Sequence, residues 1–277
     1  AFPTETVYGL GANALDAQAC EKIFAAKGRP GDNPLIVHVT GIEQAKKIAH
    51  VDELAEALMQ AFWPGPLSLV LPKKECVPMA VTAHLNTVAI RCPNHAVALA
   101  LIRESGLPIA APSANLSGKP SPTWGSHVFA DLRGKTAMIL DAGPVEIGLE
   151  STVLLVKPGN CVLLRPGGIE KDQLETICGP VFLPQAKDKE KPAAPGMKYK
   201  HYAPEGEVKL GCNQEEIEHW LQEGRKKGAK KIILLLTEEM KVAFPSLPEE
   251  VIVFGTEKDL RTVAHNLFAA LRQCDME

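Results

Sequence analysis

Aromatic residues are scarce in this chain, at 5% of 277 residues, and neither sign of charge dominates. Lys and Arg number 30 against 33 Asp and Glu, which gives a formal net charge of −3. Proteins that bind nucleic acid through their whole surface are normally basic. We therefore expect no stable nucleic-acid binding, although a local basic site stays open. The longest apolar runs, such as residues 232–236, are far shorter than the ~18 residues that a membrane span requires, so we expect no membrane partner.

The seven cysteines are scattered, and no two of them form a C-x-x-C pair. This spacing indicates neither a disulfide framework nor a zinc knuckle. Reduced thiols in the cytoplasm are the simplest interpretation, and we expect a cytoplasmic protein. The chain starts at Ala1 instead of Met, which leaves open a removed targeting peptide.

Standard catalytic signatures are missing as well. Gly134-Lys135-Thr136 resembles the end of a Walker A loop, but the first glycine of that motif would fall at Phe129. No H-E-x-x-H or G-x-S-x-G segment is present. The sequence therefore excludes the standard phosphate loop and the standard nucleophilic triads.

The length predicts about two domains. In the first part, short apolar runs alternate with helical patterns, which predicts an α/β (α+β) fold with one twisted mixed sheet. We expect helices at residues 16–27, 52–62 and 96–105, and strands at residues 34–39, 67–71, 87–92, 108–111, 137–140, 152–156 and 161–165.

The composition changes near Pro184, where a charged, proline-rich stretch without periodicity predicts a linker. A β-α-β pattern beyond it predicts a smaller Rossmann-like domain. Its expected strands are residues 208–211, 231–237 and 250–254, and its expected helices are residues 215–224 and 259–274. We divide the chain into a first domain (1–183), a linker (184–206) and a second domain (207–277).

Polar residues in apolar or glycine-rich surroundings are the candidate site. Lys27 and Arg29 flank Gly28 at the end of the first expected helix, where cations also favour the helix dipole. Arg29 continues into a rigid turn in which Asn33 can bond a ligand or its own backbone. His38 lies inside an apolar strand, where a lone histidine is more often a satisfied core group than a ligand.

Two further segments suit anionic ligands. Period-two alternation places Thr87 and Arg91 on one face of a strand, about 13 Å apart. The planar fork of arginine suits a carboxylate or a phosphate, although an edge-strand surface arginine fits the pattern too. Ser113 and Asn115 follow an apolar strand among small residues, where exposed N–H groups can cradle a phosphate; a tight turn is the alternative.

Several segments match one enzyme family when they are taken together and in order. They are PTETVYGL (3–10), KGRP (27–30), NPLIVH (33–38), APSAN (111–115) and EST (150–152). They resemble the YrdC-like domain of threonylcarbamoyl-AMP synthases, and PGMKYKHYAP (195–204) resembles the linker of that family's long, two-domain form.

The resemblance implies an activity that joins L-threonine, bicarbonate and ATP into threonylcarbamoyl-AMP and pyrophosphate. Other proteins, the expected downstream partners, then transfer the threonylcarbamoyl group to an adenosine beside the anticodon of certain tRNAs. This chemistry needs no enzyme nucleophile, so catalysis should rest on positioning and cations. A Mg²⁺ ion that bridges the phosphates is implied by the nucleotide chemistry, whereas the sequence shows no dedicated metal site.

The resemblance also implies site residues, position by position. Catalysis is assigned to Lys27, Arg29, Ser113 and Asn115. Threonine binding is assigned to Thr6, His38, Arg91 and Ser151. ATP binding is assigned to Arg29, Asn33, Thr87, Ala111 (through its backbone), Ser113, Ser121, Arg165 and Tyr202.

Tyr202 lies in the linker, which in the resembled family returns over the active site, so we expect residues 184–206 to act as a lid. The family normally has residues before the Thr6 motif, and the chain stops at Glu277 inside what looks like the last part of the second domain, so we expect both ends to be truncated here. Two alternatives stay open: an RNA-binding module, and a relative that makes carbamoyl-AMP from carbamoyl phosphate.

Overall fold

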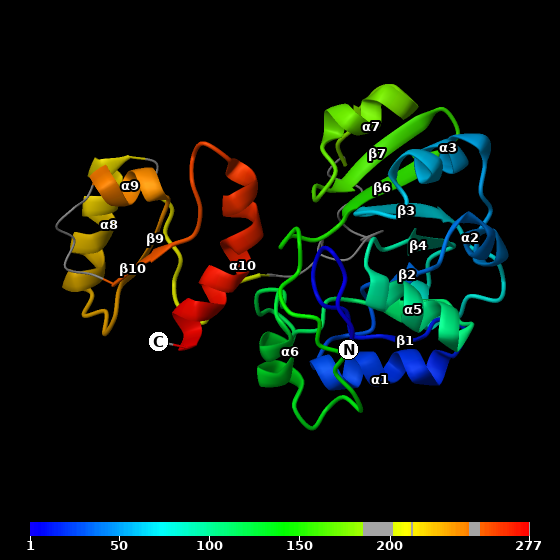
Figure 1. Cartoon of the computed structure of the whole chain (residues 1–277), viewed down its shortest axis with the longest axis horizontal. Helices are drawn as coiled ribbons and strands as arrows, with labels where there is room; N and C mark the ends of the chain where they lie inside the picture. Colours follow the sequence, from blue (N-terminus) through cyan, green and yellow to red (C-terminus); the bar gives the residue numbers. More distant parts are fainter. Residues whose placement is uncertain (185–201, 212, 244–249, 277) are drawn as a thin grey trace.

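The computed structural model describes residues 1–184, 202–211, 213–243 and 250–276. Within them, a large mixed sheet with helices forms the first part of the chain, and a smaller unit follows (Figure 1). The large sheet has eight strands in the order β1-β5-β2-β4-β3-β6-β7-β8. This arrangement confirms the predicted α/β class with a mixed sheet.

The large sheet contains both parallel and antiparallel strand pairs. β2 is parallel to β4, β3 to β6 and β7 to β8, whereas the other neighbours are antiparallel. The bounds are β1 Ala12–Asn13, β2 Ile36–His38, β3 Leu67–Pro72, β4 Thr87–Arg91, β5 Ile109–Ala111, β6 Thr152–Lys157, β7 Asn160–Arg165 and β8 Val181–Phe182.

Alternation along the strands separates two apolar layers. In β4, Val88 and Ile90 belong to the main core, whereas Ala89 belongs to a smaller cluster with Ile36 and Val70. The face that we predicted for Thr87, Ala89 and Arg91 is therefore opposite the main core, as period two requires. The main core also contains apolar side chains from four helices. They are α1 (Ala17–Lys27), α2 (Ile42–Ile48), α3 (Glu53–Phe62) and α7 (Lys171–Cys178).

The other helices of the first part are α4 (Met79–Thr82), α5 (Ala96–Ser105) and α6 (Gly125–Leu132). Helix α1 begins as predicted, because the Asp16 side chain accepts hydrogen bonds from the backbone N–H groups of Gln18 and Ala19. It ends where Gly28 adopts a left-handed conformation with φ 62°.

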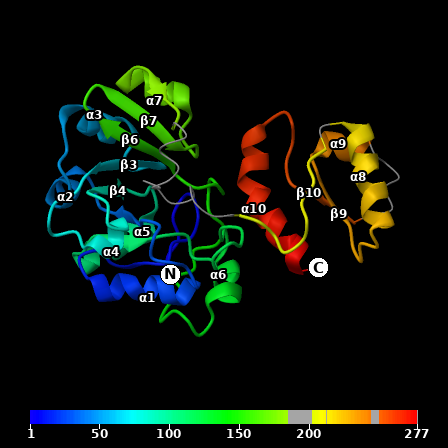
Figure 2. The ribbon, with the colours of Figure 1, turned by 180° about the vertical axis from the view of Figure 1, so that it is seen from behind.

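The smaller unit contains a two-stranded parallel sheet of β9 (Ile233–Leu236) and β10 (Glu250–Val253). Its helices are α8 (Gln214–Lys226), α9 (Glu238–Ala243) and α10 (Leu260–Met276). The predicted β-α-β pattern is therefore present in the part β9-α9-β10. Figures 1 and 2 both place α10 between this sheet and the large domain.

Two predicted strands are wrong. Residues 137–140 form no strand, because the backbone of Met138 and Leu140 bonds Ala1 at the chain start instead. Residues 208–211 form no strand either; the Leu210 carbonyl accepts a hydrogen bond from the Trp220 indole at 3.1 Å, and the Leu210 side chain is 81% exposed.

Candidate active site

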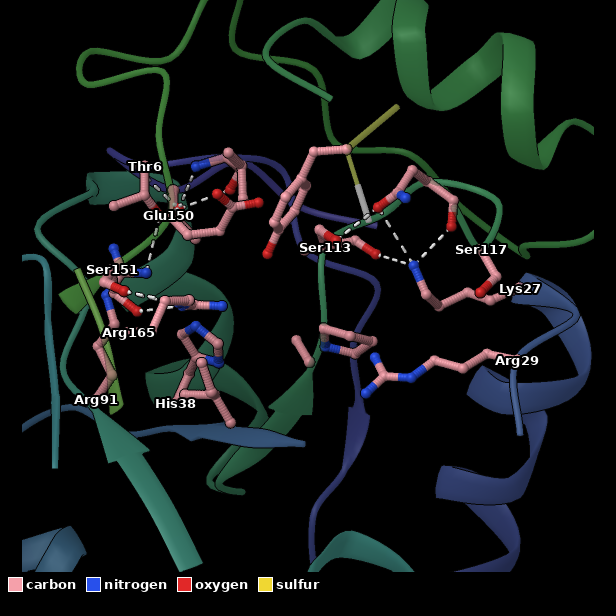
Figure 3. Close-up of a pocket in the computed structure, with 18 of the residues that line it drawn as sticks. Thr6, Lys27, Arg29, His38, Arg91, Ser113, Ser117, Glu150, Ser151 and Arg165 are labelled. Atoms are coloured by element: carbon pink, nitrogen blue, oxygen red, sulfur yellow. Dashed lines mark hydrogen bonds between the residues drawn. The ribbon is translucent and has the colours of Figure 1, made fainter. Parts of the chain in front are cut away.

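A pocket opens on the face of the large sheet that carries Ile36 and Arg91 (Figure 3). His38 and Arg91 end the parallel strands β2 and β4 and lie side by side in register. Ala111 ends β5, which is antiparallel to β2, and pairs with Ile36. Figure 3 shows two groups of lining residues: Thr6, His38, Arg91 and Ser151, which we call the Arg91 half, and Lys27, Arg29 and Ser113, which we call the Lys27 half.

Eleven of the fourteen predicted site residues line this pocket. They are Thr6, Lys27, Arg29, His38, Arg91, Ala111, Ser113, Asn115, Ser151, Arg165 and Tyr202. The structure thus brings together residues from both ends of the first domain and from the segment that follows residue 201.

Arg91 is held from several sides in the Arg91 half. Its Nη1 donates to Thr6 Oγ1 at 2.8 Å, its Nε donates to the Gly65 carbonyl at 3.2 Å, and its Nη2 lies 2.6 Å from Glu5 Oε2. Both side chains of the Arg91–Glu5 ion pair are less than 5% exposed. Burial alone would raise the pKa of Glu5, but the charge and hydrogen bond of Arg91 outweigh it and lower that pKa. A rigid, charged guanidinium therefore faces the pocket.

His38 stays neutral beside this arginine. Burial, followed by the Arg91 charge, lowers the pKa of His38 to about 3. The edge of its ring meets Phe2, with the ring centroids 5.8 Å apart. Because a neutral imidazole carries one donor and one acceptor, His38 can recognise a hydroxyl or an amine without adding charge.

Ser151 closes the Arg91 half from the start of β6. Its hydroxyl lies 2.8 Å from that of Ser68, and it accepts from Arg165 Nη2 at 3.1 Å. Arg165, which ends β7, also donates twice to the Ser151 carbonyl. The two residues thus fix each other at the carboxyl end of one strand and the amino end of its neighbour.

In the Lys27 half, the buried Lys27 ammonium bonds a neighbouring loop. Its ammonium donates to the carbonyls of Ser113 and Asn115 and to Asn115 Oδ1, and the residue is 3% exposed. Burial and the nearby Arg29 charge lower the pKa of Lys27 well below its usual value, while Asp131 opposes the shift. The Asn115 amide in turn donates to the carbonyls of Leu116 and Lys119 at 2.8 and 2.9 Å. Lys27 and Asn115 therefore hold a loop, residues 113–120, around the pocket.

Arg29 reaches the same half because Gly28 turns the chain at the end of α1. Its Nη2 donates to the Asn33 carbonyl at 3.1 Å. Lys27 and Arg29 thus place two cations beside one volume, which suits phosphate oxygens.

Three predicted residues do not line the pocket. Asn33 is fully buried beneath Arg29, and its side-chain atoms have no hydrogen-bond partner within the described residues. Thr87 begins β4, at the end of the strand away from Arg91. The buried Ser121 hydroxyl donates to the Glu150 carboxylate.

The sequence interpretation missed two carboxylates. Glu150 lines the pocket, and burial raises its pKa although Arg165 and Ser121 oppose that shift. Glu5 lies behind Arg91. The signal for Glu5 was a lone carboxylate between two threonines in the apolar segment 1–10, and the signal for Glu150 was its place in the EST motif.

A mixed sheet that carries one buried and two half-buried arginines, a buried lysine and hydroxyls around one pocket defines a class of enzymes that bind small anionic ligands. Two family models match the chain: "Telomere recombination" at residues 1–167, and "Threonylcarbamoyl-AMP synthase, C-terminal domain" at residues 169–277. The chain belongs to the threonylcarbamoyl-AMP synthase family, as predicted.

The matches extend over the chain. The threonylcarbamoyl-AMP synthase of Bacillus subtilis is 52% identical over 99% of this chain and 80% of its own length. A crystal structure of Pyrococcus abyssi Sua5 complexed with L-threonine is 46% identical, with a TM-score of 0.90 over 100% of this chain and 82% of the other. A putative threonylcarbamoyl-AMP synthase of Mycobacterium tuberculosis matches 64% of this chain at 36% identity and 82% of its own length.

Family membership makes this chain a nucleotidyltransferase that uses ATP, forms an adenylate and serves tRNA modification. Within the described residues, no helix is long and apolar enough to cross a membrane.

Proposed function

We propose that the pocket condenses L-threonine, bicarbonate and ATP into threonylcarbamoyl-AMP, pyrophosphate and water. Threonine binds in the Arg91 half and ATP in the Lys27 half. The observation that carries this division is that one pocket is lined by the buried Arg91 guanidinium in one half and by the two cations Lys27 and Arg29 in the other. The L-threonine complex of the similar Pyrococcus abyssi Sua5 supports the choice of amino acid.

Arg91 pairs with the threonine carboxylate through N–H groups that Glu5 and Thr6 leave available. The hydroxyls of Thr6 and Ser151, with the neutral ring of His38, surround the remaining polar atoms of threonine. Bicarbonate takes up a proton and loses water to give carbon dioxide. The threonine amine, after losing one proton, adds to the carbon dioxide and releases a second proton. This addition forms the N–C bond of a carbamate.

A carbamate oxygen then attacks the α-phosphorus of ATP. One P–O bond forms, the bond to the β-phosphate oxygen breaks, and pyrophosphate leaves with the bonding electron pair. Negative charge grows on the leaving group, so Lys27 and Arg29 stabilise the transition state electrostatically. Ser113 and Asn115 hold the phosphate-binding geometry, and Arg165 and Tyr202 contact the adenylate. Asn33, Thr87 and Ser121 support this half from outside the pocket lining.

Mg²⁺ fits this site as an ion that arrives with ATP. Within the residues that the structure describes, no group of three or more His, Cys, Asp or Glu side chains could hold a metal. Glu150 is the one carboxylate among the pocket-lining residues. Because Mg²⁺ retains water and binds substrate phosphates readily, the triphosphate would supply most of its ligands. When bound, the ion neutralises phosphate charge.

In the proposed domain organisation, residues 1–183 form the catalytic domain, residues 184–206 form a lid and residues 207–277 form the second domain. The lid segment 185–201 lies outside the described residues. β8 extends the large sheet to Phe182, which supports a boundary after that strand. The product would pass to tRNA threonylcarbamoyl-transfer proteins in the cytoplasm. Family membership favours this activity over the RNA-binding and carbamoyl-phosphate alternatives.

Pyrophosphate release from ATP, with each co-substrate omitted in turn, tests the proposal. We expect release only when L-threonine and bicarbonate are both present, together with a product of the mass of threonylcarbamoyl-AMP. Release that carbamoyl phosphate supports and threonine does not would instead identify the carbamoyl-adenylate relative.

A further inference from the structure

One face of helix α10 packs against the first domain and the end of the linker. His265, Phe268, Arg272 and Asp275 follow a spacing of three and four residues, which places them on the same side of the helix. His265 Nδ1 lies 2.7 Å from the Glu146 carbonyl, and Phe268 packs against Tyr202 with the ring centroids 5.3 Å apart. This face therefore contacts the first domain through His265 and the lid segment through Phe268.

Arg272 makes the deepest of these contacts. Its Nε and Nη2 donate to the Pro120 carbonyl at 3.0 and 2.6 Å, and Nη2 also donates to Asp131 Oδ2 at 2.7 Å. The side chains of this ion pair are 7% and 3% exposed. An arginine of the second domain is thus buried inside the first.

Both partners of Arg272 are part of the loop 113–120 or hydrogen-bond to it. Pro120 ends the loop, and Asp131 Oδ2 accepts from the Leu116 N–H at 3.2 Å. Lys27 holds the same loop from the pocket side through Ser113 and Asn115. The loop is therefore fixed between the catalytic lysine and an arginine from α10, which lies 245 positions further along the chain.

We propose that Arg272 is a positioning residue for ATP: it sets the loop 113–120 from the side opposite Lys27. This inference rests on the proposed function. It makes the second domain part of the nucleotide site, acting through one side chain as well as through the linker.

The chemistry of the contact argues for positioning. Burying an ion pair incurs a desolvation penalty that an apolar pair of similar size would avoid, so attachment of the two domains does not require charge. A guanidinium, however, fixes a carbonyl and a carboxylate at defined angles. None of the Arg272 partners belongs to the Arg91 half, so its loss should affect ATP selectively.

The test compares Arg272→Met with Arg272→Lys in the whole chain. Arg261→Met is the matched control, because Arg261 lies on the same helix, its side chain is 91% exposed and it pairs with Asp259 nearby. Pyrophosphate release gives KM for ATP and for threonine, and equilibrium binding of ATP gives Kd without turnover. We expect Arg272→Met to raise KM and Kd for ATP about tenfold, as loss of charged hydrogen bonds predicts, while KM for threonine changes less than about twofold.

Arg272→Lys should recover part of the ATP affinity, and Asp131→Asn should repeat the effect of Arg272→Met without adding to it in the double variant. Unchanged ATP affinity in a folded Arg272→Met protein, or equal losses for ATP and threonine, would overturn the inference. If Arg272→Met does not fold, the Arg272→Lys and Asp131→Asn variants give the same comparison. If the unaltered protein shows no threonine-dependent release of pyrophosphate, the proposed function is contradicted. The Kd values for ATP would still test the role of Arg272 in that case.

Discussion

At the scale of single residues, the pocket depends on charges that are buried and paired. Arg91 and Glu5 form such a pair beneath the proposed threonine site. We predict that Arg91→Ala lowers the free energy of unfolding by about 3–5 kcal/mol, because it leaves the Glu5 carboxylate buried without its cation. Denaturant unfolding measures this loss.

The double variant Glu5→Gln/Arg91→Ala should recover a substantial part of that stability, since a neutral amide replaces the stranded charge. It should not recover threonine binding, which needs the guanidinium. Lys46→Ala is the control, because the Lys46–Glu56 pair is partly exposed and its loss should lower the free energy of unfolding far less. Equal effects of Arg91→Ala and Lys46→Ala would show that burial does not govern the Arg91 pair.

At this scale Thr6 and Tyr202 were expected only from the family resemblance, whereas polar residues that interrupt apolar or glycine-rich segments gave a local signal of their own. Lys27, Arg29 and Arg91 stood out in this way, and the structure places all three around one pocket. The partners of these residues were harder to find. Glu5 pairs with a residue 86 positions away in the sequence, and Arg272 pairs with one 141 positions away. The pattern of neighbouring residues does not show which residues at such separations form a pair.

At the scale of elements, a left-handed turn controls where the cations of the Lys27 half point. Gly28 has φ 62°, and no atom lies within 4 Å of the place where its Cβ would stand. We predict that Gly28→Ala costs about 1 kcal/mol of stability from backbone strain alone. It should also raise KM for ATP a few fold, since Lys27 and Arg29 are joined through this residue.

Gly28→Asn provides the comparison, because asparagine tolerates the left-handed region better than alanine does. Thermal unfolding and KM for ATP should place Gly28→Asn between the natural protein and Gly28→Ala. If the alanine and asparagine variants behave alike, backbone strain is not the cause.

Elements with a strong periodic pattern were predictable from the sequence. The spacing of residues 87–92 predicted β4 and its two faces, and the residues before Gly28 predicted α1 with its Asp16 cap. Helices α6 and α7 were not predicted. The first turn of α7 contains polar residues and only Leu174 of the helix is buried, so tertiary contacts and the capping box at Glu170 establish it more than an apolar stripe does.

At the scale of the whole molecule, the lid segment contributes Tyr202 to a pocket whose strands all belong to the first domain. Tyr202 lines the pocket, has φ 61°, and is followed by Ala203, whose N–H donates to the Gly118 carbonyl at 3.1 Å. The backbone after the linker thus reaches the same loop 113–120 that Arg272 supports. The Ala203 contact and the Arg272 contact thus both connect the C-terminal part of the chain to the Lys27 half.

This asymmetry predicts the result of shortening the chain after Pro184. The Mycobacterium tuberculosis relative consists largely of the part that matches the first domain, which supports independent folding of residues 1–184. Thr6, His38, Arg91 and Ser151 remain in the shortened protein, so the Kd for threonine, measured by calorimetry, should change less than about threefold. Turnover should fall about 100-fold, because misplacement of a reacting group by about 1 Å has an effect of that size. Full turnover by residues 1–184 would contradict the proposed lid. Loss of threonine binding together with turnover would show that the second domain supports the entire pocket and not the Lys27 half alone.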